Sequence, residues 1–129
     1  MTLTVVNAQN DLTVTVTNVA NEDGVVRLAL FKGDNGFPDE EKSAHKTATV
    51  DISNGKATHT FKNLPEGDYG ISTFHDSRNT GKIRTNALGI PRDGYGFSNN
   101  VMGTFGPPSY KDASFPVKGG KTEIEIKLR

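Results

Sequence analysis

The chain has 129 residues, enough for one domain with a single hydrophobic core. Its 15 basic residues balance its 15 acidic residues, so the net charge gives no reason to expect nucleic acid or an anionic membrane as a partner. The absence of cysteine excludes disulfides, thiolate zinc sites and a cysteine nucleophile, and no apolar run approaches the roughly 18 residues that span a bilayer.

Residues 1–10 form an N-terminal extension before the first expected strand. They have no basic segment, and their apolar stretch is too short for a complete secretory signal. The run Val6-Asn7-Ala8 ends in small residues, as the tail of a signal cleavage site does. Two interpretations stay open: the remnant of an export leader, or a few disordered or strand-extending residues. We assign residues 11–129 to one domain.

Short segments with a period-two alternation of apolar and polar residues follow one another along this domain, and turn residues separate them. The alternation predicts seven strands, at residues 11–19, 25–31, 47–52, 56–61, 68–75, 114–118 and 121–128. No segment has a helical period, so we expect an all-β protein: a seven-stranded antiparallel sandwich of the immunoglobulin-like or transthyretin-like kind. The inward-facing residues predict the core: Leu12, Val14, Val16, Val26, Leu28, Leu30, Val50, Ile52, Phe61, Tyr69, Ile71, Val117, Ile124 and Ile126.

Two turns have strong hairpin signals. Asn54-Gly55 stands between two alternating runs and favours a type I′ turn, and Gly119-Gly120 separates the last two strands. We therefore expect one hairpin at each place. The polar segment 32–45 is expected to be a loop whose Phe37 packs back against the core.

Residues 76–111 are the exception to this pattern, because they form a long insertion with six glycines, three prolines and four of the ten aromatic residues. A segment of this length without its own order is uncommon in a compact domain. Its aromatic residues supply apolar surface that a disordered segment would lack. We expect an ordered loop that packs Phe97, and at least one of the other three aromatic residues, against the sandwich.

Two patterns resemble known families. Leu64-Pro65-Glu66-Gly67-Asp68-Tyr69 resembles the turn and strand entry of transthyretin-like and collagen-adhesin B-type sandwiches. A second set of residues, from about Leu12 to Leu128 and densest in the long loop, resembles a bacterial family known only as a domain of unknown function (DUF2141). Its most specific segments are His75-Asp76, Gly89-Ile90-Pro91, Gly94 to Asn100 and Gly106-Pro107-Pro108. The resemblance implies an exported protein, periplasmic or extracellular, and implies no activity.

The segment Asp76–Asn86 has the outline of a calcium loop, with an acidic residue at position 1 and glycine at position 6. Its candidate ligands are Asp76, Asn79, Thr80 and the carbonyl of Lys82. Arg78 and Arg84 stand where carboxylates or amides would be needed, and their charge would repel a divalent cation. We expect a degenerate loop that has lost its ion, with Arg78 or Arg84 pairing with Asp76 instead; a calcium-binding module is the alternative.

The residues give little support to catalysis. His75 and Asp76 are adjacent in a strand and point to opposite faces, so they should not pair as a base and its orienting acid. His59 is in phase with Ala57 and Phe61, which predicts a partly buried core histidine. No serine stands in a nucleophile elbow. We expect no enzyme, with a hydrolase as a distant third hypothesis, and no cofactor unless calcium binds.

The aromatic part of the long loop is the strongest candidate for a binding site. Aromatic rings supply apolar area at low entropic cost, and neighbouring asparagines supply adaptable hydrogen bonds. The candidate ligand-binding residues are Tyr95, Phe97, Asn99, Asn100, Phe105 and Tyr110. The alternative is that these rings only cap the sandwich. The leading hypothesis is a non-catalytic exported protein with a binding or structural role, whose partner is a protein or a carbohydrate.

Overall fold

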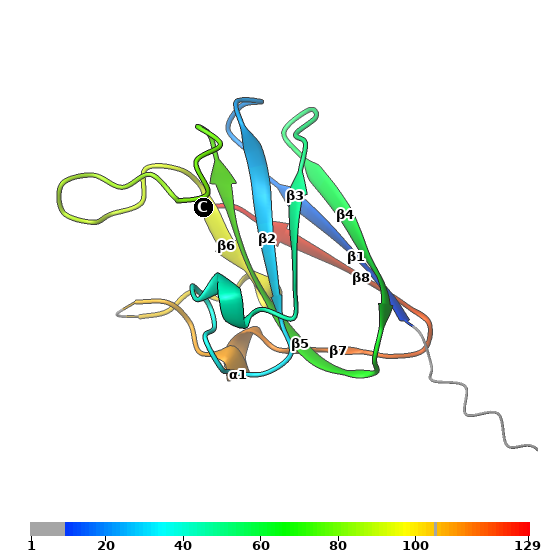
Figure 1. Cartoon of the computed structure of the whole chain (residues 1–129). Coiled ribbons are helices and arrows are strands. Elements are labelled where there is room, and N and C mark those ends of the chain that lie inside the picture. Colours follow the sequence, from blue (N-terminus) through cyan, green and yellow to red (C-terminus); the bar gives the residue numbers. More distant parts are fainter. Residues whose placement is uncertain (1–9, 105) are drawn as a thin grey trace, which may run out of the picture.

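A computed structural model describes residues 10–104 and 106–129; the extension at 1–9 and the candidate residue Phe105 lie outside the described residues. The described part is mostly β, with two sheets (Figure 1). The strands are β1 (Asn10–Thr17), β2 (Val25–Phe31), β3 (Lys46–Val50), β4 (Ala57–Leu64), β5 (Gly67–Asp76), β6 (Tyr95–Phe97), β7 (Phe115–Val117) and β8 (Lys121–Lys127). Three one-turn helices are η1 (Glu41–Ser43), η2 (Ser98–Asn100) and α1 (Tyr110–Ala113). None of the helices in this part of the chain is long and apolar enough to cross a membrane.

The smaller sheet has three strands in the order β4-β1-β8. Its central strand β1 runs antiparallel to β4 and parallel to β8. Leu12, Val14 and Val16 of β1 are fully buried, whereas the threonines between them remain partly accessible. The alternation read from the sequence therefore predicts correctly which face of this strand is turned to the core.

The larger sheet has five strands. Four of them have the order β3-β2-β5-β6, and β7 pairs with the first residues of β5. Val26, Leu28 and Leu30 of β2 face the core, together with Tyr69 and Ile71 of β5. The residues between them face away from the smaller sheet, and this outer face carries the candidate site described below.

The two sheets share one hydrophobic cluster, to which β1, β2, β4, β5, β7 and β8 all contribute. Nearly every residue predicted to be in the core is buried there. Val50, Ile52 and Ile124 are the exceptions, and they are partly buried against the same cluster. All three are at or beyond the outer strands, where one side of each residue has no neighbouring strand.

The predicted number of strands and the predicted antiparallel pairing are both wrong in detail. The described residues form eight strands instead of seven, because Tyr95–Phe97 adds a strand to the free edge of β5. This strand was missed because it has three residues, one of them glycine. The sheets are also not purely antiparallel, since β1 and β8 run in parallel.

Neither expected hairpin forms a two-stranded ladder. The Asn54-Gly55 turn exists, with positive φ at both residues, but β3 pairs with β2 and β4 pairs with β1 in the other sheet. Gly119-Gly120 likewise connects β7 in one sheet to β8 in the other. A turn sequence fixes the local reversal of the chain, whereas burial of the following strand decides which sheet it joins.

Candidate binding groove and loop root

The outer face of the larger sheet presents two rows of side chains, fixed by the strand register. One row runs Thr49, Arg27, Phe74, Tyr95 and the other Thr47, Ala29, Ser72, Phe97, each across β3, β2, β5 and β6. All eight residues line a groove of about 810 Å³. Because these residues alternate with the core residues of the same strands, the groove floor lies directly on the sheet.

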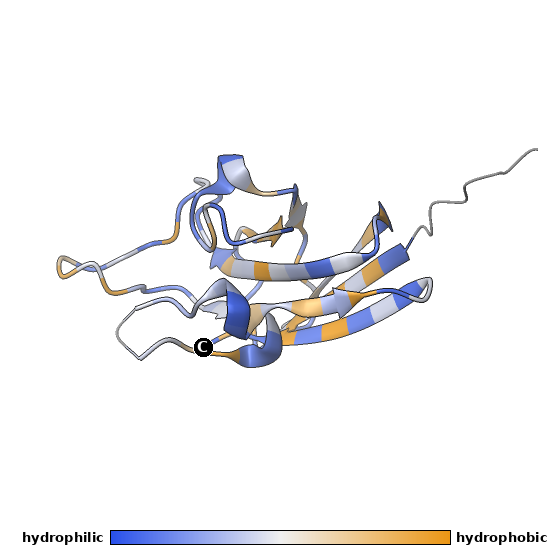
Figure 2. Ribbon diagram, turned by 90° about the horizontal axis from the view of Figure 1, so that it is seen from below, coloured by the Kyte–Doolittle hydropathy of each residue, from blue (hydrophilic) through white to orange (hydrophobic). Residues whose placement is uncertain are grey.

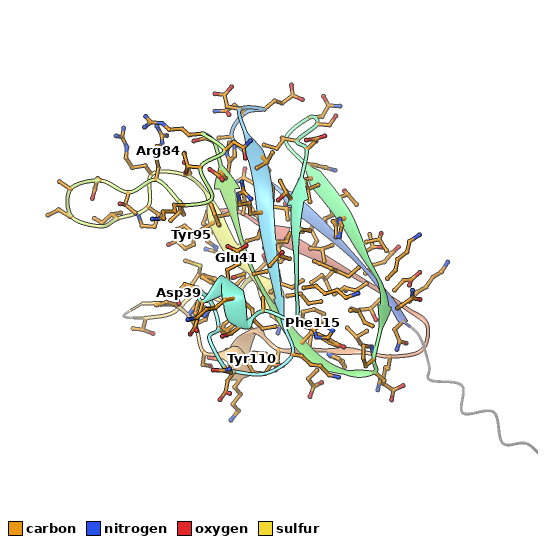
Figure 3. The ribbon with its side chains drawn as sticks, viewed as in Figure 1. Asp39, Glu41, Arg84, Tyr95, Tyr110 and Phe115 are labelled. Carbon is orange, nitrogen blue, oxygen red and sulfur yellow. The ribbon has the colours of Figure 1, made fainter. Side chains whose placement is uncertain are left out.

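Segments on two sides form the walls of this groove. Pro38, Asp39 and Glu41 come from the segment between β2 and β3, and a hydrogen bond of 2.6 Å from Ser72 Oγ to the Pro38 carbonyl fixes that wall to the floor. The other wall comes from the long loop and includes Lys82, Ile83, Thr85, Pro91, Met102 and Pro107. Tyr95, Asp39 and Glu41, which are labelled in Figure 3, all line this groove.

An aromatic cluster adjoins the groove through Phe97, which belongs to both. The ring of Phe37 contacts Phe31 at 5.3 Å, Tyr110 at 5.7 Å and Phe97 at 6.3 Å, all in edge-to-face geometry. A Cβ at Gly70 would stand 3.1 Å from the Tyr110 ring, so the cluster packs closely on the backbone of β5. The expectation that Phe37 returns to the core needs correction, because it packs on the outer face of the sheet instead.

The predicted ligand-binding residues separate into two groups. Tyr95 and Phe97 line the groove, and their rings are 6.0 Å apart. Tyr110 belongs to the aromatic cluster and donates a hydrogen bond of 3.0 Å to the Asp68 carbonyl. Tyr110 and the two asparagines are not among the residues that line the groove.

The side chains of Asn99 and Asn100 form hydrogen bonds with distant backbone groups. Asn99 Nδ2 donates to the carbonyls of Asp112 and Ser114, which ties η2 to the region of α1. Asn100 Oδ1 accepts from the Lys127 amide at 2.8 Å, on the free edge of β8. Both asparagines adopt a positive φ, which asparagine tolerates better than most residues. Their amides therefore hold the fold together, and Tyr95 and Phe97 are the predicted binding residues that face the groove.

Sequence reasoning missed most of the groove floor. Thr47, Thr49, Arg27 and Phe74 stand between the predicted core positions of their strands, and the sequence alone assigns them no role. The usable signal was that these outward positions are small, aromatic or arginine rather than uniformly charged. It could not be used without the register that aligns the four strands.

The beginning of the long loop is built around Asp76, whose side chain is 1% exposed. Its carboxylate accepts hydrogen bonds from Arg27 Nε at 2.5 Å, from the Thr80 amide at 3.0 Å and from the Gly81 amide at 2.7 Å. Burial acts to raise the pKa of Asp76, but the hydrogen bonds from Arg27, Thr80 and Gly81 and the charge of Arg27 together hold this pKa below its ordinary value. Asp76 is therefore an ionised, fully partnered carboxylate.

The guanidinium of Arg27 binds Asp76 at the position where the sequence pattern predicts a calcium ion. It also donates to Asn79 Oδ1 at 2.8 Å, so two of the four predicted calcium ligands bind the same arginine. The expected partner of Asp76 was Arg78 or Arg84, and this prediction is wrong. Arg84 pairs with Asp93 at 2.9 Å instead, and Arg27 reaches Asp76 because the two lie on neighbouring strands.

The other two predicted ligands do not face this carboxylate. Thr80 Oγ1 donates to the Lys82 carbonyl, so the side chain of Thr80 and that carbonyl satisfy each other. Among the described residues, no group of three or more histidine, aspartate or glutamate side chains is placed to hold a metal ion.

The three histidines lie in different environments. His75 is buried on β5, and its Nε2 donates to the Asp23 carbonyl at 2.6 Å, which ties the turn before β2 to the beginning of the loop. His59 is partly buried, as predicted, with its ring 4.6 Å from Phe61, and burial lowers its pKa. Burial, followed by the charges of Lys32 and Lys46, lowers the pKa of His45.

Together these features define a small protein whose described residues form two β-sheets, with a groove on the outer face of the larger sheet. The chain belongs to a bacterial family described as "uncharacterized protein conserved in bacteria" (DUF2141), whose model matches residues 14–125. This match confirms the family predicted from the sequence and covers the groove and the loop root. No curated protein and no solved structure gives a significant match to the chain.

Proposed function

We propose that this protein is a non-catalytic, exported binding module that holds a carbohydrate in the groove on its larger sheet. The observation that carries the proposal is the groove of about 810 Å³ with aromatic and hydroxyl side chains side by side on its floor. Small-molecule sites in proteins commonly have volumes of roughly 300–1,000 Å³. Export rests on the family resemblance alone.

The chemistry of the groove favours a neutral ligand with many hydroxyl groups. Phe74 and Tyr95 are neighbours on the floor and offer ring surface to the apolar face of a sugar. Asp39 and Glu41 accept hydrogen bonds, and Lys82 on the opposite wall donates them. Sugar hydroxyls both donate and accept, and a groove with acids on one side and a lysine on the other has no preference for a strongly charged ligand.

Two sheets that share one core support a sandwich of the immunoglobulin-like or transthyretin-like kind for this module. In such an arrangement the strands form a rigid platform, and the connecting segments provide variable walls. The groove has this design, because its floor is strand and both walls are loop.

The calcium-binding alternative is less well supported. A divalent ion at Asp76 would have to displace Arg27 from two ligands at once. The displaced guanidinium would then stand close to the ion and repel it.

Binding of neutral oligosaccharides, screened on a glycan array and measured by isothermal titration calorimetry, tests the proposal. Tyr95→Ala should weaken binding about tenfold, because a lost ring contact costs about 0.5–1.5 kcal/mol in addition to the lost area. Thr47→Val should also weaken it, whereas Thr58→Val should not, because Thr58 is an equally exposed threonine on the smaller sheet. Binding that survives both groove substitutions would contradict the proposal.

A further inference from the structure

Residues 82–93 form a narrow projection that we call the finger. Its two sides are joined by backbone hydrogen bonds from Arg92 N to Arg84 O at 2.7 Å and from Asn86 N to Ile90 O at 2.9 Å. At the tip, Asn86 Oδ1 accepts from the amides of Leu88 and Ile90. Figure 1 shows this yellow-green segment extending away from both sheets.

The tip of the finger is apolar and exposed. Leu88 is 83% exposed and Ile90 is 55% exposed, the two highest values among the large hydrophobic residues of the described chain. Figure 2 shows the same tip as a hydrophobic end on an otherwise polar projection. Two exposed aliphatic side chains at the end of a protruding loop form a small apolar surface that a partner can cover.

The surroundings of this tip are basic. Arg78, Lys82, Arg84 and Arg92 stand between positions 77 and 92, and no acidic residue does. Arg84 is paired with Asp93, but Arg78, Lys82 and Arg92 are exposed and form no ion pair within the part of the chain that the structure describes. The acids that balance these charges lie elsewhere, including the run Asp39-Glu40-Glu41. The zero net charge of the chain thus conceals a basic projection, in which Lys82, Arg84 and Arg92 outnumber Asp93.

We propose that the finger docks the protein onto an anionic phospholipid surface, with Leu88 and Ile90 in the headgroup region and the basic residues on lipid phosphates. Stable attachment to a membrane surface usually needs two signals, an apolar group and a basic patch, and the finger carries both. A protein interface commonly buries about 800 Å² per partner over a broad patch, whereas a narrow tip with two aliphatic side chains offers little such area. The small apolar area argues against a protein partner, and the positive charge of the basic residues is complementary to an anionic lipid surface.

Sedimentation with lipid vesicles tests this docking and is independent of any ligand in the groove. The wild-type protein should bind vesicles that contain phosphatidylglycerol, should not bind pure phosphatidylcholine vesicles, and should dissociate in high salt because salt screens the phosphates. Leu88→Ser/Ile90→Ser should lower the partition coefficient about tenfold, since an aliphatic side chain gains from leaving water. Leu88→Met/Ile90→Met should bind like the wild type because it keeps the apolar surface.

The charge is tested by Arg78→Gln/Arg92→Gln, which removes one cation just before the finger and one within it. This variant should bind anionic vesicles about twenty-fivefold less tightly, because each cation at an anionic surface is worth about fivefold. Lys56→Gln/Lys118→Gln removes the same charge from exposed positions outside the finger and should bind like the wild type. All four replaced residues are exposed, so circular dichroism should show an unchanged fold.

Any of three results would overturn the proposal: no binding to anionic vesicles, equal binding to neutral vesicles, or finger variants that bind as the wild type does.

Discussion

Replacing Arg27 by methionine should destabilise the protein by about 2–3 kcal/mol at neutral pH. Methionine keeps most of the packing of the arginine stem but removes the only cation paired with Asp76 among the described residues. Hydrogen bonds to charged groups are worth about 1.5–3 kcal/mol, and breaking a buried ion pair costs about 3–5 kcal/mol. The lower part of this range applies because the Thr80 and Gly81 amides still bind the carboxylate.

The stability lost on replacing Arg27 by methionine should depend on pH in a defined direction. The pKa of Asp76 in the folded protein lies below its ordinary value of 3.8, so its contribution is present above that value and is lost as the pH falls through the folded pKa. Without Arg27, the pKa of Asp76 in the folded protein should rise, because burial is then opposed by the backbone amides alone. The stability difference between wild type and Arg27→Met should therefore be largest above about pH 5 and shrink toward pH 2.

Urea unfolding curves recorded across this pH range measure the effect. A double-mutant cycle with Asp76→Asn isolates the pair, and a coupling energy of about 1.5–3 kcal/mol is expected at neutral pH. A coupling below about 0.5 kcal/mol, or a loss that does not change with pH, would refute the view that Arg27 serves as the cation of this loop.

Three further outcomes are expected. Calcium should leave the melting temperature unchanged, because Arg27 already binds Asp76 and Asn79; a calcium-dependent rise that Asp76→Ala abolishes would show the opposite. Leu28→Ala should cost about 2–5 kcal/mol in a denaturant titration, since Leu28 is 2% exposed in the core; less than about 1 kcal/mol would mean that its burial is misassigned. Ser98→Ala should cost about 1–3 kcal/mol in the same assay, because the buried Ser98 Oγ accepts from the Ile71 amide and donates to the Ala113 carbonyl; an unchanged midpoint would contradict this.

The alternation of side chains was sufficient to predict most of the strands and the inner face of each, as Leu12, Val14 and Val16 illustrate. It could not predict which strands pair. Asn54-Gly55 reverses the chain as expected, yet the next strand joins the other sheet, because Ala57 and Phe61 are buried there against the same core. Pairing is decided by contacts distant in the sequence, and no local signal reports them.

The same limit applies to the candidate site. The partner of Asp76 is 49 positions away in the sequence, on a strand that the register places beside it. The arginine among the apolar residues of β2 is recognisable in the sequence, but the sequence does not identify its ion-pair partner. Tyr95 could be recognised from its own segment, whereas Thr47, Arg27 and Phe74 become part of one floor only when three strands are aligned.

The long loop is held in place by aromatic packing and by hydrogen bonds. Phe97 and Tyr110 pack with Phe37, which agrees with the prediction that Phe97 and at least one other aromatic residue of the loop pack on the sandwich. Much of the remaining anchorage is polar, through Asp76 at the beginning and Asn99 and Asn100 toward the end. Asp76 ties the beginning of the loop to β2 of the larger sheet, and Asn99 and Asn100 tie its later part to the region of α1 and to β8, while the tip of the finger stays exposed.

This arrangement connects the two proposals. Ile83, Thr85 and Pro91 of the finger are also part of one groove wall, so the groove is beside the projection that carries Leu88 and Ile90. A finger docked on a lipid surface would place the groove next to that surface, where ligands attached to the membrane have a high effective concentration. A low affinity of the groove for its ligand would then be sufficient for binding at the membrane surface. Vesicles that carry a groove-binding sugar on anionic lipid should be bound more tightly than either component alone, and Tyr95→Ala should remove that gain while leaving the attachment to plain anionic vesicles intact.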